Sequence, residues 1–233
     1  MRRSGALGAL SPVLGIGLLL SACAAPRYEY VRNTEAKTAF RIPTDWAVFE
    51  ESTVSGTEST ADTPDNIDWL VGIDADPIPS VGNVYPSRFA TDYPQGIAAV
   101  LSLTGESRDV TSFQALRNLL IPIDQIRDEV GTDAVRILEY DDLVVRDGLR
   151  GLRMVVQVQE SALTSGASQE DTTEGSGGGA GFLSGTYVQM SQILLLDDTT
   201  EHAYVLALLC SADCFARDES EIESAIDSWT VLP

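Results

Sequence analysis

Three cysteines offer the most specific side-chain chemistry in this 233-residue chain, and two of them lie close together near the C-terminus. Cys210 and Cys214 are four residues apart, so a turn between them brings the two thiols within disulfide distance. A zinc site would need further thiolate or imidazole ligands, and His202 is the only histidine of the sequence. A redox-active pair normally has the spacing C-x-x-C, which differs from this one. We therefore expect a structural Cys210–Cys214 disulfide, as in exported proteins.

The third cysteine, Cys23, follows an N-terminal segment with the three parts of a secretory signal. Arg2-Arg3 gives a positive start, residues 5–20 carry no charge, and small residues come directly before the cysteine. Leu20-Ser21-Ala22-Cys23 resembles the lipobox of bacterial lipoprotein precursors. The resemblance implies that residues 1–22 are a signal peptide, cleaved between Ala22 and Cys23, and that Cys23 receives a diacylglyceryl thioether. Whether the new amino group also carries a fatty acyl chain such as palmitate is left open.

Two other interpretations of this N-terminal segment are weaker. A buried helix would leave the paired arginines and the final cysteine unexplained. An uncleaved membrane anchor needs about 20 apolar residues, and this run is interrupted by Pro12 and several glycines. We therefore expect a protein that is lipid-anchored to the cell membrane through diacylglyceryl-Cys23, on the extracytoplasmic face.

The chain is strongly acidic, with 15 basic and 35 acidic residues and a net charge of −20. Removal of Arg2-Arg3 with the signal peptide would leave 13 basic residues and a net charge of −22, and Lys37 is the only lysine. Nucleic-acid binding requires a basic surface, so this class is excluded. An anionic leaflet would repel such a domain, so the lipid has to hold it there. The acidity favours solvation of an exposed protein, with recruitment of cations or a basic partner as the alternative.

After the cysteine we expect a lipidated tether and one folded domain. The tether covers residues 23–36, where Tyr28 and Tyr30 either lie at the level of the lipid head groups or begin the first strand. The domain covers residues 37–233, which is enough chain for a single core. Two stretches rich in Ser, Thr, Gly and acidic residues are expected to be polar loops, residues 51–66 and 161–181.

Apolar periodicity predicts strands at both ends of the domain and helices in its middle. The expected strands are 39–43 with 46–49 as its antiparallel partner, then 69–73, 97–103, 135–145, 152–159, 187–196 and 203–209. The expected helices are 113–120, 123–130 and a last one that begins at a capping box of Asp218 and Glu221 and buries Ile222, Ala225, Ile226 and Trp229. This order of elements indicates one α+β domain around an antiparallel sheet.

Short motifs add a resemblance to a known fold. They are Phe40-Arg41-Ile42-Pro43 with Trp46, the turn Gly148-Leu149-Arg150-Gly151, and the closing segment from Ile222 to Ser228-Trp229. Together they are similar to the PsbP/Mog1-like fold and to the Lpq-type lipoproteins of mycobacteria and their relatives. The resemblance implies an α-β-α sandwich with a central antiparallel sheet, used as a non-catalytic binding or adaptor module. It supplies no active-site residues.

Catalytic and metal-binding signatures are weak throughout. His202 stands beside Glu201 at a turn, where a surface role is favoured, and the Gly-x-Ser-x-Gly and His-Glu-x-x-His motifs are absent. A group of acids could gather calcium, although the EF-hand spacing is missing and solvated side chains are favoured: Asp62, Asp65, Asp68, Asp74 and Asp76. No metal and no cofactor is therefore predicted. A carboxylate-pair hydrolase has no diagnostic spacing and stays an alternative.

The preferred hypothesis is a non-catalytic lipoprotein of the cell envelope that binds a partner, either an envelope protein or a cell-wall component. Its expected contact surfaces are the polar loops 51–66 and 161–181, unless these are simple insertions. The alternative is a carrier of a small molecule or lipid, which requires a sizeable apolar pocket between sheet and helices. The carboxylate-dependent hydrolase is the weakest of the three.

Overall fold

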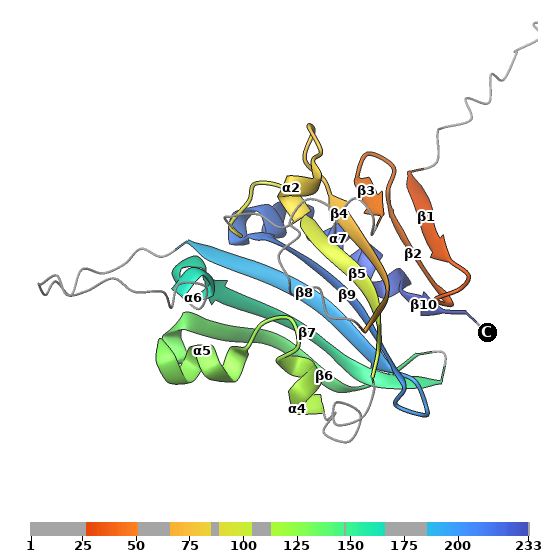
Figure 1. The fold of residues 1–233 in the computed structure, drawn as a ribbon. Coiled ribbons are helices and arrows are strands. Elements are labelled where there is room, and N and C mark those ends of the chain that lie inside the picture. Colours follow the sequence, from red (N-terminus) through yellow and green to blue (C-terminus); the bar gives the residue numbers. More distant parts are fainter. Residues whose placement is uncertain are drawn as a thin grey trace, which may run out of the picture.

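Two antiparallel sheets form the framework of the protein (Figure 1). The structure is a computed structural model and describes residues 27–50, 66–84, 89–103, 113–146, 148–165 and 186–232. The larger sheet has seven strands in the order β3-β4-β5-β9-β8-β7-β6, and the smaller has three in the order β1-β2-β10.

The elements have the following bounds. The small sheet consists of β1 (Tyr28–Asn33), β2 (Thr38–Pro43) and β10 (Thr230–Val231). The large sheet consists of β3 (Ala47–Glu50), β4 (Ile67–Asp74), β5 (Gln95–Ser102), β6 (Val135–Arg146), β7 (Leu149–Gln159), β8 (Tyr187–Leu196) and β9 (His202–Ser211). The helices are α2 (Val81–Val84), α4 (Phe113–Arg117), α5 (Ile123–Glu129), α6 (Glu160–Ser165) and α7 (Ala212–Ser228), with a 3-10 turn at Thr132–Ala134.

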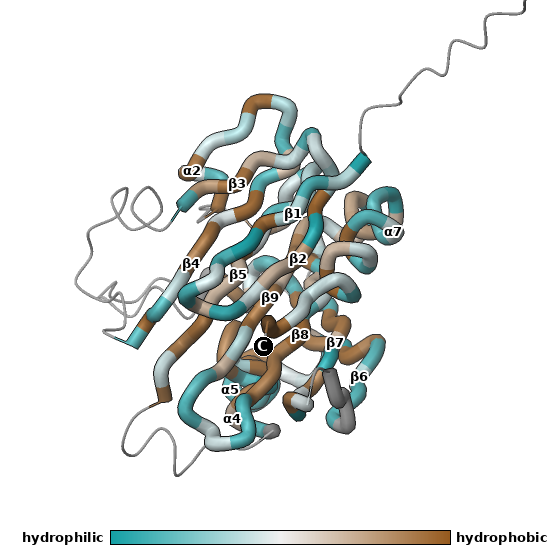
Figure 2. Tube along the Cα trace, turned by 90° about the vertical axis from the view of Figure 1, so that its right-hand side faces the viewer, coloured by the Kyte–Doolittle hydropathy of each residue, from teal (hydrophilic) through white to brown (hydrophobic). Residues whose placement is uncertain are grey.

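Both faces of the seven-stranded sheet are covered. On one face, α7 and the small sheet pack on alternate residues of the strands, including Val71, Leu206 and Ile193. On the other, α4, α5 and α6 pack on the residues in between, such as Val205 and Leu194. Figure 2 shows that β8 and β9 are largely hydrophobic. The predicted α+β class with a central antiparallel sheet is confirmed, and the helices on both sides make it an α-β-α sandwich.

Helix α7 closes the fold and begins earlier than expected. Its N-cap is Ser211, whose hydroxyl accepts a hydrogen bond from the backbone N–H of Cys214 at 3.2 Å. The prediction that it begins at Asp218 and Glu221 is therefore wrong, because a hydroxyl cap was already available at the end of β9. The Cys210–Cys214 disulfide joins that end of β9 to the first turn of α7. The predicted apolar stripe is buried as expected: Ile222, Ala225, Ile226 and Trp229 are at most 1% exposed.

The N-terminal part of the domain differs from the prediction in two ways. Residues 28–33 form β1 and pair with β2 in one continuous register, from Tyr28 opposite Pro43 to Asn33 opposite Thr38. The boundary between tether and domain at residue 36 is thus wrong, and Tyr28 and Tyr30 belong to the first strand. The expected pairing of strand 46–49 with strand 39–43 is also wrong, because β3 pairs with β4 in the large sheet.

The long hairpins follow the predicted pattern closely. Gly148 has φ +87° in the turn between β6 and β7, a conformation that favours glycine. Met154, Val156 and Val158 share one buried face of β7, and Val155 is buried on the opposite face. Arg153 on that second face pairs with Glu223 and Asp227 of α7. Helix α7 therefore covers this face of β7.

The two polar loops lie mostly outside the described residues. Loop 51–66 has only Asn66 described, and loop 161–181 is described only up to Ser165. Residues 161–165 belong to α6, whose Ala162 is buried, so the prediction of a loop from residue 161 is wrong at its start. Ala162 packs in the core beneath α5, and that apolar contact holds the extra helical turn after β7.

Candidate functional site

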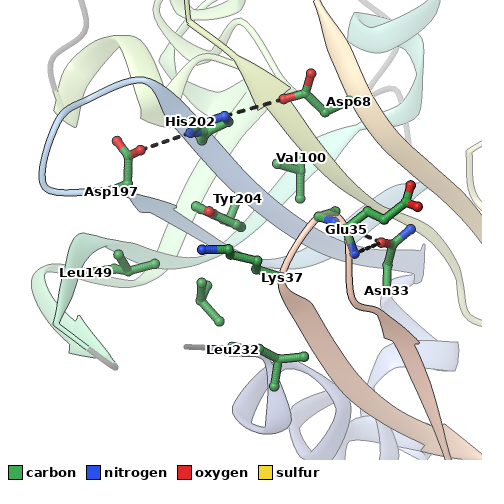
Figure 3. Close-up of a pocket in the computed structure, with 12 residues that line it drawn as sticks. Asn33, Glu35, Lys37, Asp68, Val100, Leu149, Asp197, His202, Tyr204 and Leu232 are labelled. Carbon is green, nitrogen blue, oxygen red and sulfur yellow. Dashed lines mark hydrogen bonds and ion pairs between the residues drawn. The ribbon is translucent and has the colours of Figure 1, made fainter.

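A cleft of about 860 Å³ lies where the turn between β1 and β2 meets the large sheet. We call it the His202 cleft (Figure 3). Its polar and charged lining residues are Asn33, Glu35, Lys37, Asp68, Asp197 and His202. Its apolar and aromatic lining residues are Ala36, Val100, Leu149, Tyr204, Val231 and Leu232. Apolar walls with a few convergent polar groups, in a volume of this size, are the usual features of a small-molecule site.

The turn between β1 and β2 places the only lysine of the chain at the cleft. Asn33 Oδ1 accepts hydrogen bonds from the backbone N–H groups of Glu35 (2.9 Å) and Ala36 (2.8 Å), which closes the turn. Lys37 completes it with a left-handed backbone at φ +51°. The carbonyl of Lys37 accepts a hydrogen bond of 2.7 Å from Leu232, so the segment after β10 stabilises the same turn.

The opposite wall is formed by His202, which lies between two carboxylates. Its Nδ1 is 3.0 Å from Asp197 Oδ2, and its Nε2 is 3.8 Å from Asp68 Oδ2. Asp197 belongs to the β8–β9 turn and also accepts a hydrogen bond of 2.7 Å from the backbone N–H of Glu201. Asp68 belongs to β4 and accepts a hydrogen bond of 2.6 Å from Ser102. The imidazole therefore links β4 to the start of β9.

Two groups of this cleft have displaced pKa values. Burial raises the pKa of the Asp197 carboxyl, but the hydrogen bonds from His202 and Glu201 outweigh burial and lower it below the ordinary value. Burial, followed by the charges of Asp197 and Asp68, raises the pKa of the Tyr204 phenol. At neutral pH the cleft thus contains an ionised Asp197 and a neutral Tyr204, whose hydroxyl can donate a hydrogen bond.

The polar groups of this cleft can hold a ligand by charge and by hydrogen bonding. Both ring nitrogens of His202 face carboxylates, Nδ1 at 3.0 Å from Asp197 and Nε2 at 3.8 Å from Asp68. The described residues that line the cleft include neither a serine nor a cysteine as a nucleophile. Lys37 on one wall and Asp68 on the other instead offer charges of both signs above an apolar floor.

The acidic residues considered for calcium have separate roles where the structure describes them. Asp74 is fully buried and accepts hydrogen bonds from Ser80 N–H and Asn83 Nδ2, both at 2.9 Å, which fix the loop after β4. Asp76 accepts a hydrogen bond from the backbone N–H of Ile78. Asp68 lines the His202 cleft. Asp62 and Asp65 lie outside the described residues. Within the described ranges, no group of three or more His, Cys, Asp or Glu side chains is placed to hold a metal ion.

The sequence reasoning missed the cleft, although it contained one signal. The single lysine and single histidine of a chain with 35 acidic residues line the same cleft. His202 was expected at the surface, and its side chain is 40% exposed, but it faces the cleft and its two carboxylates. Cys23 and Ala22 lie outside the described residues, so the lipidation and cleavage sites stay predictions. None of the helices that the structure describes is long and apolar enough to span a bilayer.

Comparison with known proteins gives structural neighbours only. No protein-family model and no curated protein sequence matches the chain. The cyanobacterial PsbP of Synechocystis sp. PCC 6803 is 9% identical with a TM-score of 0.44, covering 97% of this chain and 99% of that chain. The Ran-binding protein Mog1p of Saccharomyces cerevisiae is 10% identical, with a TM-score of 0.44 and coverages of 88% and 95%. LpqN, involved in cell envelope biogenesis of Mycobacterium tuberculosis, is 11% identical, with a TM-score of 0.42 and coverages of 84% and 83%.

Proposed function

We propose that this protein is a lipid-anchored, non-catalytic binding protein on the extracytoplasmic face of a bacterial cell membrane, and that its partner or ligand enters the His202 cleft. The anchor is supported by the lipobox-like Leu20-Ser21-Ala22-Cys23 and by the short distance in sequence from Cys23 to the start of β1 at Tyr28. The Cys210–Cys214 disulfide fits an oxidising compartment.

The observation that carries the binding role is the composition of the His202 cleft. In a chain this acidic, the only lysine and only histidine stand on opposite walls of one cleft, with Asp68 and Asp197 beside the histidine. Charges of both signs above an apolar floor favour a partner that presents a charged group next to an apolar one. A side chain of an envelope protein and a component of the cell wall both fit that description.

A small-molecule carrier is the second candidate, and the volume of the same cleft favours it. About 860 Å³ lies within the range of ordinary ligand sites. The apolar interior that a lipid carrier would require receives less support, since the hollow between α5 and α6 measures only about 70 Å³. A carboxylate-dependent hydrolase is not favoured, because His202 occupies the space between Asp68 and Asp197.

The anchor is tested by Cys23→Ala in the natural host or a bacterium that processes lipoproteins. We expect loss of palmitate labelling, loss of the corresponding mass, and release of the protein from the membrane fraction. Arg32→Ala on β1 serves as the matched control, since Arg32 is exposed and lies nine residues after the cysteine in the sequence. Unchanged mass and unchanged membrane association of Cys23→Ala would refute the anchor.

The binding role is tested by cross-linking and affinity capture from intact envelopes with Lys37→Gln/His202→Gln. We expect capture of the partner to fall with this pair and to persist with Arg32→Gln, which changes a charge outside the cleft. Deletion of loops 51–66 or 161–181 tests the contact surfaces predicted from sequence. Full capture by the Lys37→Gln/His202→Gln protein would contradict the assignment of the cleft.

A further inference from the structure

A second cleft of about 860 Å³ lies at the opposite end of the β1–β2 hairpin from the His202 cleft. The first described residue, Arg27, and the end of β2, Pro43, line it, whereas Asn33 and Lys37 line the other. We call it the Arg217 cleft, after a lining that includes Arg27, Trp46, Tyr93, Arg217, Asp218 and Glu221.

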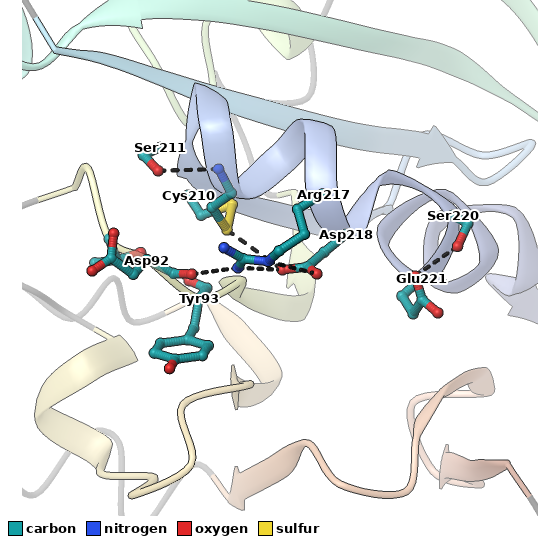
Figure 4. Close-up of polar contacts among 10 residues, drawn as sticks. Asp92, Tyr93, Cys210, Ser211, Arg217, Asp218, Ser220 and Glu221 are labelled. Atoms are coloured by element: carbon teal, nitrogen blue, oxygen red, sulfur yellow. Dashed lines mark hydrogen bonds and ion pairs between the residues drawn. A yellow bond between two sulfur atoms is a disulfide. The ribbon is translucent and has the colours of Figure 1, made fainter.

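The two arginines of this cleft form ion pairs with carboxylates of α7, and Figure 4 shows the pair of Arg217 with Asp218. Arg27 pairs with Glu221, and Arg217 Nη2 lies 2.7 Å from Asp218 Oδ2. Arg217 Nη2 also donates to the carbonyl of Asp92 at 2.6 Å, and its guanidinium lies 5.9 Å from the centre of the Tyr93 ring. The side chains of Arg27 and Arg217 nevertheless stay 70% and 54% exposed. Their remaining N–H groups are thus accessible to an anionic oxygen from outside.

The position of this cleft relative to the anchor follows from the length of the chain between them. This inference rests on the proposed lipidation of Cys23. Four residue steps separate Cys23 from Arg27, so their Cα atoms lie at most about 15 Å apart. The six residues of β1 then carry the chain about 20 Å further to the turn at Asn33. A thioether held in the bilayer therefore brings the Arg217 cleft to the head-group layer and allows the His202 cleft to face away.

The rim of the Arg217 cleft exposes apolar side chains on the same side of the molecule. Pro77 lines the cleft, and its neighbour Ile78 is 82% exposed at the tip of the loop between β4 and α2. The backbone N–H of Ile78 donates to Asp76 Oδ1 at 2.7 Å, so the tip is fixed by a local turn. Tyr93, which also lines the cleft, is 38% exposed. Exposed apolar and aromatic side chains of this kind are typical of surfaces that meet a membrane interface.

The charge of the cleft favours a zwitterionic head group. Hydrogen bonding from Ser220, together with the pairing with Arg27, outweighs burial and lowers the pKa of Glu221, so this carboxylate is ionised at neutral pH. Each of the two guanidinium groups of the cleft is thus paired with a carboxylate. A mature chain with a net charge of −22 would be repelled by an anionic surface, whereas a zwitterionic one carries no such penalty.

We propose that the Arg217 cleft rests on the bilayer that holds Cys23 and binds the head group of a zwitterionic phospholipid. Arg27 and Arg217 donate to the phosphodiester oxygens, Asp218 and Glu221 face the ammonium group, and Ile78 enters the interface.

The test places a photo-cross-linking amino acid at Tyr93 of the full chain, lipidated in cells and reconstituted into vesicles of phosphatidylethanolamine and phosphatidylcholine. The matched control carries the same amino acid at Glu35, an exposed lining residue of the His202 cleft. After irradiation, mass spectrometry of the protein counts phospholipid adducts and, separately, reports the lipid on Cys23. We expect adducts at position 93 and few or none at position 35.

Loss of the arginines tests the chemistry of the contact. Arg27→Ala/Arg217→Ala should lower adduct formation at position 93 by about tenfold or more, because a lost hydrogen bond to a charged phosphodiester oxygen corresponds to at least about that factor. Arg32→Ala/Arg150→Ala removes two other exposed arginines and should leave the yield unchanged. A lipidated protein with equal adducts at positions 93 and 35 overturns this inference and leaves the anchor standing. A protein with no lipid on Cys23 overturns both.

Discussion

The two clefts have the same volume and lie at opposite ends of the β1–β2 hairpin, but different elements of the fold line them. The His202 cleft is lined by strands of both sheets and by the β1–β2 and β8–β9 turns, and one histidine joins Asp197 to Asp68 there. The Arg217 cleft is lined by turns and by α7, where each arginine is paired with a carboxylate of that helix. Since β1, β4 and β9 run from one cleft to the other, one rigid sandwich separates them. The fold can therefore present two unlike surfaces at a fixed distance.

The largest expected effect comes from the core that supports both clefts. Trp229 is fully buried, 5.4 Å from the ring of Phe40 and 6.4 Å from that of Trp69. Trp229→Ala should lower the free energy of unfolding by about 3–5 kcal/mol, since it removes a large buried side chain. Urea denaturation measures the loss. A loss below about 1 kcal/mol would mean that the small sheet does not depend on this contact.

Reduction of the disulfide should affect one cleft and leave the other unchanged. Cys210 and Cys214 close a five-residue ring beside the Arg217 cleft, so reduction of the native protein should cost about 2 kcal/mol in the loop-entropy model. Hydrogen exchange should increase in the first turns of α7 and stay unchanged at the β8–β9 turn. Equal increases at both places would show that the two clefts are not energetically separate.

The smallest effect is expected from Asp197→Asn, which changes the His202 cleft alone. Loss of the charged hydrogen bonds to His202 and Glu201 should cost about 1–2 kcal/mol at neutral pH. Because the folded protein lowers the pKa of Asp197, its contribution is complete above the unfolded value of about 3.9 and is lost as the pH falls through the lower folded value.

Unfolding curves of wild type and Asp197→Asn at several pH values check this sign. The difference between the two proteins should be constant around neutral pH and should close in acid, below about pH 4. A difference that instead grew in acid would contradict the lowered pKa of Asp197.

The elements predicted well from sequence are those whose pattern is local. The hairpin of β8 and β9 has two long apolar runs, and the stripe from Ile222 to Trp229 repeats with the helical period. The sequence leaves β1 undecided between the tether and a first strand, because it is an edge strand whose side chains are all exposed or half-buried. The partner of β3 was missed because pairing depends on segments distant in sequence rather than on the nearest strand.

The candidate site was less predictable than the fold for the same physical reason. Asp68 and His202 meet because β4, β5 and β9 lie side by side, with a register shift between Ile67 and Trp69, and the β1–β2 turn adds Lys37. Their side chains form no spaced motif. Only the rarity of lysine and histidine in the composition distinguished two of them in advance.

The register of β1 on β2 has a mechanical consequence for an anchored protein. The proposed anchor would join the fold at Tyr28, and the His202 cleft lies at the far end of the same hairpin, beyond Asn33. A pull between the membrane and an occupant of that cleft would act lengthwise along the two strands, across hydrogen bonds that lie perpendicular to it. The six residue pairs, from Tyr28 with Pro43 to Asn33 with Thr38, would then share the load in shear instead of opening one after another.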